Sequence, residues 1–88
     1  MTLEQKVAVV TGGGQGLGRA ITVALARAGA KIVVADMNLA AAKSVADEVV
    51  HAGGEAVAME VDVANESSVN RLRDRTLGEW DRVDILIA

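Results

Sequence analysis

Short runs of apolar residues recur at regular intervals along the chain. Those at residues 6–11, 32–35 and 55–61, and a last run that opens at Val83, are continuous or alternate with polar residues, which is typical of strands. Nearly continuous apolar runs are expected where both faces of a strand are covered. Asp36 directly follows the second run. The pattern therefore predicts four strands.

Between these runs, apolar residues recur at three- and four-residue steps, which predicts amphipathic helices. Asn38 is placed to cap the second helix, and glycines close the first helix at Gly29 and the second at Gly53 and Gly54. The side chains expected to mark the three helices are Leu17, Ala20, Ile21, Ala24, Leu25 and Ala28 in the first, Leu39, Ala42, Val45, Ala46 and Val49 in the second, and Val69, Leu72, Arg73, Thr76 and Trp80 in the third.

Strands that alternate with helices predict a parallel sheet, because each parallel connection needs a covering crossover. Right-handed crossovers place helices on both faces. We expect an α/β fold: a three-layer Rossmann-type half-fold with sheet order 3-2-1-4, in which a ligand lies across the crevice between the first and fourth strands. No linker or repeat interrupts the pattern, so residues 1–88 form one domain.

Composition narrows the classes of function. The chain is 51% hydrophobic and 24% charged with no proline, as in an ordinary folded domain. A net charge of −3 offers no basic patch for nucleic acid, and no apolar run is long enough to span a membrane. Without cysteine, and with His51 as the only histidine, a metal site is not expected. No secretory signal is visible at the start, so we expect a cytoplasmic protein.

A glycine-rich loop, residues 11–18, connects the first strand to the first helix. Glycine lets a ligand contact the backbone, and the first helical turn offers unpaired N–H groups and a partial positive charge. We expect Gly12 to turn the chain out of the strand, Gly16 to let a pyrophosphate approach, and Gly18 to let helix and strand pack closely. A flexible connection without a ligand is the alternative.

Asp36 lies at the carboxyl end of the second strand, where an acidic side chain can accept hydrogen bonds from an adenosine ribose. Its charge would repel a 2′-phosphate, and neither Gln15 nor Met37 carries a positive charge to attract one. The sequence therefore favours NAD over NADP. A helix-capping or strand-ending aspartate is the alternative.

The pattern Thr11-Gly12-x-x-x-Gly16-x-Gly18, with Asp36 after the second strand and Asp62-Val63 after the third, resembles the short-chain dehydrogenase/reductase family over the whole chain. The resemblance implies that Asp62 hydrogen-bonds the adenine amino group and that Val63 lines the adenine pocket. Asp62 can also be read as a turn residue before the third helix. The expected cofactor-binding residues are Gly12, Gly14, Gln15, Gly16, Leu17, Gly18, Asp36, Met37, Asp62 and Val63.

The resemblance also implies hydride transfer between an alcohol and a ketone, with a tyrosine, a serine and a lysine four residues after the tyrosine as catalytic residues. This sequence has no tyrosine, so we assign no catalytic residue. We expect a truncated NAD-binding domain whose small-molecule alcohol or ketone binds only in a complete enzyme. A non-catalytic nucleotide-binding module is the first alternative. The second is a fragment that self-associates through its exposed fourth strand.

Overall fold

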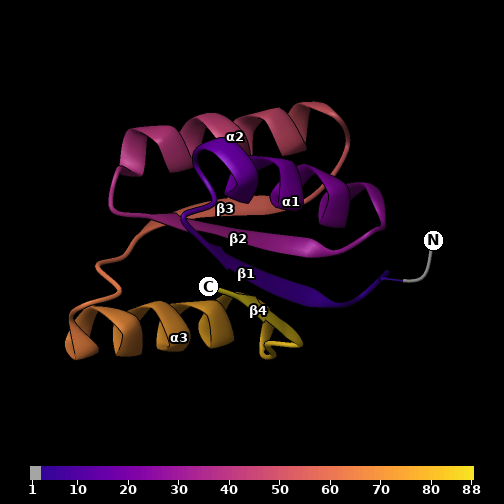
Figure 1. The fold of residues 1–88 in the computed structure, drawn as a ribbon. Helices are drawn as coiled ribbons and strands as arrows, with labels where there is room; N and C mark the ends of the chain where they lie inside the picture. The colour runs from indigo at the N-terminus through magenta and orange to yellow at the C-terminus, as the bar shows by residue number, and fades with distance from the viewer. Residues whose placement is uncertain (1–2) are drawn as a thin grey trace.

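The computed structural model describes residues 3–88 and contains every predicted strand and helix (Figure 1). In chain order the elements are β1 (Val7–Thr11), α1 (Gly16–Arg27), β2 (Lys31–Asp36), α2 (Leu39–His51), β3 (Ala56–Glu60), α3 (Glu66–Trp80) and β4 (Ile85–Ile87). The last strand is shorter than predicted, since it begins at Ile85 and not at Val83. No helix within residues 3–88 is both long and apolar enough to cross a membrane.

The four strands form one sheet in the order β3-β2-β1-β4, which confirms the predicted order. Each neighbouring pair is parallel, with Val9 of β1 opposite Val33 of β2 and Leu86 of β4. Helices α1 and α2 cover one face of the sheet and α3 covers the other (Figure 1). The predicted three-layer α/β half-fold is therefore present, with the carboxyl ends of β1, β2 and β3 on a common edge.

Successive residues of each central strand supply two separate cores, because side chains alternate between the two faces of a sheet. Ala8 and Val10 of β1 pack with α1 and α2, whereas Val9 packs with α3. Every residue of β1 except Thr11 is buried, as are the four apolar residues of β2. Burial on both faces explains why these strands are nearly continuous apolar runs.

The face predicted for α1 is wrong in part, because Ile21 and Leu25 pack against the core as expected but other predicted residues do not. Leu17 is 77% exposed, and Ala20 and Ala24 are exposed as well. The fully buried residue is Thr22, whose hydroxyl donates to the carbonyl oxygen of Gly18 at 2.9 Å. Because that bond satisfies the hydroxyl within the helix, a polar side chain can face the core there.

The face predicted for α3 is wrong in part. Leu72 and Thr76 are buried as expected, but Val69 is 39% exposed. Ser68 is buried in place of Val69. The hydroxyl of Thr76 donates to the carbonyl oxygen of Leu72 at 2.8 Å, the same device that buries a threonine in α1.

Asp84 anchors the start of β4 to the start of β1. Its carboxylate oxygen Oδ2 accepts from the Val7 N–H at 2.9 Å, and its own N–H donates to the Val7 carbonyl oxygen at 2.9 Å. Arg82 donates to the same carboxylate through Nε and a terminal nitrogen, each at 2.7 Å. The hydrogen bonds from Arg82 and Val7 lower the pKa of Asp84 below its ordinary value. This contact lies at the opposite end of β1 from the glycine loop.

Candidate functional site

The glycine loop leaves the carboxyl end of β1 and leads into α1. Gly12 has a φ of 68°, which is the turn out of the strand predicted for this residue. A Cβ atom on Gly18 would collide with the carbonyl oxygen of Gly12, so the start of the helix packs closely against the end of the strand, as expected. At Gly16, no atom lies within 4 Å of the position that a Cβ would take. The backbone at Gly16 is thus open to a ligand.

The amino terminus of α1 differs from those of the other two helices. Asn38 caps α2 by accepting from the Ala41 N–H, and Asn65 caps α3 by accepting from the Ser68 N–H, both at 3.0 Å. Gln15 stands at the same position before α1, but its side chain makes no capping hydrogen bond. Like α2, and unlike α3, which begins with Glu66, α1 carries no acidic residue in its first turn. The N–H groups and the positive end of this helix are thus left for an anion.

Asp36 lies directly beside this loop. Its Oδ2 accepts from the Gly14 N–H at 3.1 Å, and its Oδ1 accepts from the Asn38 N–H at 3.0 Å. Asp36 therefore has the strand-ending role that was the alternative to ribose binding. Each carboxylate oxygen can accept a further hydrogen bond, so the side chain keeps acceptor capacity for a ribose. The adjacent Met37 is 67% exposed.

Asp62 lies at the end of β3, next to a cavity of about 290 Å³. Its Oδ1 accepts from the Ala64 N–H at 3.0 Å, and its own N–H donates to the Ser68 hydroxyl oxygen at 2.9 Å. The turn role considered for Asp62 is therefore also present. The cavity is lined by Met37, Glu60, Val61, Asp62, Asn65, Ser68 and Arg71.

The structure thus brings Asp36 to the glycine loop and places Met37 and Asp62 in one cavity. Val63 is 63% exposed and does not line that cavity. Asn65, Ser68 and Arg71 also belong to this region, although the sequence did not lead us to predict them there. Asn65 caps α3 by accepting from the Ser68 N–H, and an asparagine three residues after Asp62 is a capping signal that was available in the sequence.

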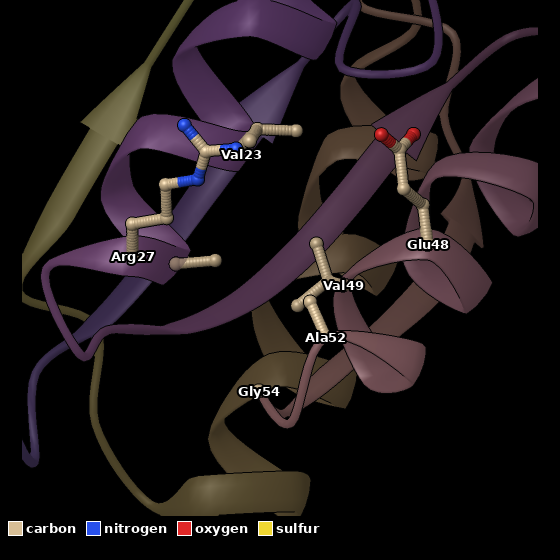
Figure 2. Close-up of a pocket in the computed structure, with 7 residues that line it drawn as sticks. Val23, Arg27, Glu48, Val49, Ala52 and Gly54 are labelled. Carbon is tan, nitrogen blue, oxygen red and sulfur yellow. The ribbon is translucent and has the colours of Figure 1, made fainter.

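A second cavity, of about 120 Å³, lies between α1 and α2 (Figure 2). Arg27 of α1 and Glu48 of α2 stand on opposite sides of it, and Glu48 also accepts from Arg19 Nε at 3.0 Å. None of the predicted cofactor-binding residues lines this cavity. Within residues 3–88, no three His, Cys, Asp or Glu side chains are grouped so that they could hold a metal ion.

The model of the family described as short chain dehydrogenase matches residues 6–88. The chain belongs to the short-chain dehydrogenase family. Curated relatives include the 7alpha-hydroxysteroid dehydrogenase of Escherichia coli strain K12 and the sorbitol dehydrogenase of Cereibacter sphaeroides, each 39% identical over 87 residues. These alignments cover 99% of this chain, but 34% and 33% of the two relatives. The chain thus spans about a third of the length of these dehydrogenases.

Solved hydroxysteroid dehydrogenases share the fold. A hydroxysteroid dehydrogenase from Escherichia coli superposes with a TM-score of 0.94 at 40% identity, over 96% of this chain and 36% of that one. A 7alpha-hydroxysteroid dehydrogenase complexed with NADH and 7-oxo glycochenodeoxycholic acid superposes with a TM-score of 0.93 at 40% identity. That match covers 96% of this chain and 33% of the other. The Rossmann-type half-fold is therefore that of the family.

Proposed function

We propose that this chain is the cofactor-binding portion of an NAD-dependent short-chain dehydrogenase that interconverts an alcohol and a ketone by hydride transfer. Alone, it binds nucleotide without turnover, because a sequence without tyrosine lacks the proton donor expected of the family. Residues 1–88 then form an NAD-binding domain whose catalytic half is not in this sequence. We also propose a cytoplasmic location, which the absence of cysteine supports.

The open amino terminus of α1 is the observation that supports nucleotide binding most strongly. A helix with neither a side-chain cap nor an acidic first turn, preceded by a glycine loop, is suited to a pyrophosphate. Asp36 then takes the ribose, and Asp62 with Val63 takes the adenine. In this proposal Gly12, Gly14, Gln15, Gly16, Leu17, Gly18 and Met37 complete the cofactor site.

Titration of the 88-residue chain with NAD, NADP and ADP tests this proposal. We expect NAD and ADP to bind weakly, since only the adenosine half is contacted, and NADP to bind more weakly still. Calorimetry or ligand-observed NMR gives the affinities. Absence of NAD and ADP binding at millimolar ligand would contradict nucleotide binding by this chain.

Asp36→Arg tests the choice of cofactor. Arginine removes the charge that repels a 2′-phosphate and offers a bidentate partner for it, so the ratio of NADP to NAD affinity should rise by about tenfold or more. The same titrations measure this ratio. Asp47→Arg, an identical charge change at an exposed position of α2, serves as the control and should leave the ratio unchanged.

Self-association is a second candidate, and a specific observation favours it. Among the described strands, β4 pairs only with β1, and Leu86 on β4 is 66% exposed. The open edge of an apolar strand can pair with the same edge of a second copy. A clean monomer in sedimentation at high concentration would contradict this candidate.

A further inference from the structure

The N–H groups of the glycine loop fall into two sets. Gly13 donates its N–H to the carbonyl oxygen of Ala35 at 3.1 Å, and Gly14 donates its N–H to Asp36 Oδ2 at 3.1 Å. Both bonds tie the middle of the loop to the end of β2. The first turn of α1, from Gly16 on, has no side-chain cap and is the set left for a ligand.

The carboxylate of Asp36 also fixes the element behind the loop. Its other oxygen accepts the N–H of Asn38, the residue that caps α2. Gly14 packs against the first turn of that helix, where a Cβ on Gly14 would come within 2.9 Å of backbone atoms of Ala41 and Ala42. One carboxylate therefore joins the loop, the end of β2 and the start of α2 without any ligand.

We propose that Asp36 is a positioning residue for the pyrophosphate as well as an acceptor for the ribose. It holds the glycine loop in the conformation that presents the N–H groups of α1, so the site is formed before the nucleotide arrives. This inference rests on the proposed nucleotide binding. It predicts that Asp36 also affects the binding of a ligand that has no ribose.

The positioning role and a purely electrostatic role predict opposite changes in the affinity for inorganic pyrophosphate when the Asp36 carboxylate is removed. If Asp36 acts on phosphate only through its charge, its removal relieves repulsion and strengthens binding of the anion. If Asp36 holds the loop, Asp36→Ala weakens pyrophosphate binding by about fivefold, as expected when one hydrogen bond that organises a site is lost. Asp36→Asn has one acceptor oxygen, so it can keep the hydrogen bond from Gly14 or the one from Asn38 but not both. It should therefore bind pyrophosphate more tightly than Asp36→Ala does.

The experiment uses the 88-residue chain with Asp36→Ala, Asp36→Asn and the control Asp47→Ala, which removes the same charge at an exposed position of α2. Amide chemical shifts followed in a titration with inorganic pyrophosphate, and separately with ADP, give the affinities. Hydrogen exchange of the Gly14 amide reports the loop bond directly. We expect this amide to be protected in the parent chain, to exchange at least about tenfold faster in Asp36→Ala, and to exchange at an intermediate rate in Asp36→Asn.

Equal or tighter pyrophosphate binding by Asp36→Ala would overturn the proposal, and so would unchanged exchange at Gly14. If the parent chain binds neither pyrophosphate nor ADP, the proposed function of the isolated chain fails, but the exchange of Gly14 still decides whether Asp36 holds the loop. If Asp36→Ala does not fold, the parent chain suffices: a Gly14 amide that exchanges as fast as the exposed Gly16 amide would overturn the proposal.

Discussion

At the scale of single residues, the hydroxyl group of Ser68 helps to position the backbone of Asp62. Ser68 is buried in the first turn of α3, accepts the Asp62 N–H through its hydroxyl oxygen, and donates its own N–H to Asn65. Asn65 in turn donates its N–H to the Asp62 carbonyl oxygen at 2.9 Å. Three residues thus form a closed ring of hydrogen bonds at the edge of the cavity. The ring fixes the backbone of Asp62, whose carboxylate is proposed to read the adenine.

Ser68→Ala should therefore weaken ADP binding. It removes the acceptor for the Asp62 N–H and should lower the free energy of unfolding by about 1 kcal/mol. We expect the affinity for ADP to fall by about threefold or more, and the affinity for inorganic pyrophosphate, whose proposed site is the amino terminus of α1, to stay unchanged. Thermal unfolding and NMR titration measure the two effects. Ser67→Ala changes an exposed serine on the same helix and should alter neither quantity.

Asp84 should make stability depend on pH in the acid range. Its pKa is lowered in the folded chain by hydrogen bonds from Arg82 and Val7. Its charged form therefore stabilises the fold above the unfolded pKa of about 4, and this contribution is lost as the pH falls through the lowered folded pKa. The parent chain should therefore have a higher midpoint of thermal unfolding than Asp84→Asn at pH 7, and the two midpoints should converge toward pH 3.

The matched control for Asp84 is Asp74→Asn. Asp74 makes a surface ion pair with Arg73 at 3.6 Å, and 70% of its side chain is exposed. Exposed pairs contribute little, so this variant should unfold close to the parent chain over the whole pH range. A gap between the parent chain and Asp84→Asn that stayed constant down to pH 3 would argue against the role given to Asp84.

At the scale of elements, substitution by alanine of two glycines in helices should change the free energy of unfolding in opposite directions. A methyl group on Gly18 of α1 would collide with the carbonyl oxygen of Gly12, so Gly18→Ala should destabilise the fold by roughly 1–3 kcal/mol. A methyl group on Gly78 of α3 would meet no atom within 4 Å, and Gly78→Ala should stabilise the chain by up to about 1 kcal/mol through helix propensity. Denaturant unfolding measures both. Equal effects would contradict the close packing at Gly18.

The helices and strands were predicted well from the sequence, whereas the buried faces of two helices were predicted only in part and some long-range contacts were not predicted. Periods of two and of three to four residues located the strands and helices, and the glycines and asparagines located the turns and caps. The buried face of α1 was predicted only in part: Ile21 and Leu25 pack on the core, but the pattern missed Thr22, a polar residue that satisfies its hydroxyl inside the helix. The contact of Asp84 with Val7 joins residues 77 positions apart and leaves no local signal. The bond from Gly14 to Asp36 depends in the same way on pairing between strands.

At the scale of the whole molecule, the sheet is asymmetric. The glycine loop, Asp36 and Asp62 follow β1, β2 and β3, whereas β4 forms the outer edge near the carboxyl terminus of the chain (Figure 1). Ile85 and Ile87 of β4 are half-buried on the face that α1 covers, and Leu86 is exposed on the other. A chain of this size buries only a modest share of its surface on folding. Burial of the apolar edge strand β4 against a second copy would therefore add substantially to its stability.

Pairing through β4 would couple stability to protein concentration, because a partner that binds only the folded chain stabilises it by mass action. The midpoint of thermal unfolding should then rise by several degrees over about a hundredfold increase in concentration. Leu86→Lys places a charge on the proposed interface and should abolish both this rise and the dimer seen in sedimentation. Val50→Lys places the same charge on an exposed apolar residue of α2, a helix that packs on β2 and β3, and should leave both intact. A midpoint independent of concentration in the parent chain would mean that β4 stays an open edge in solution.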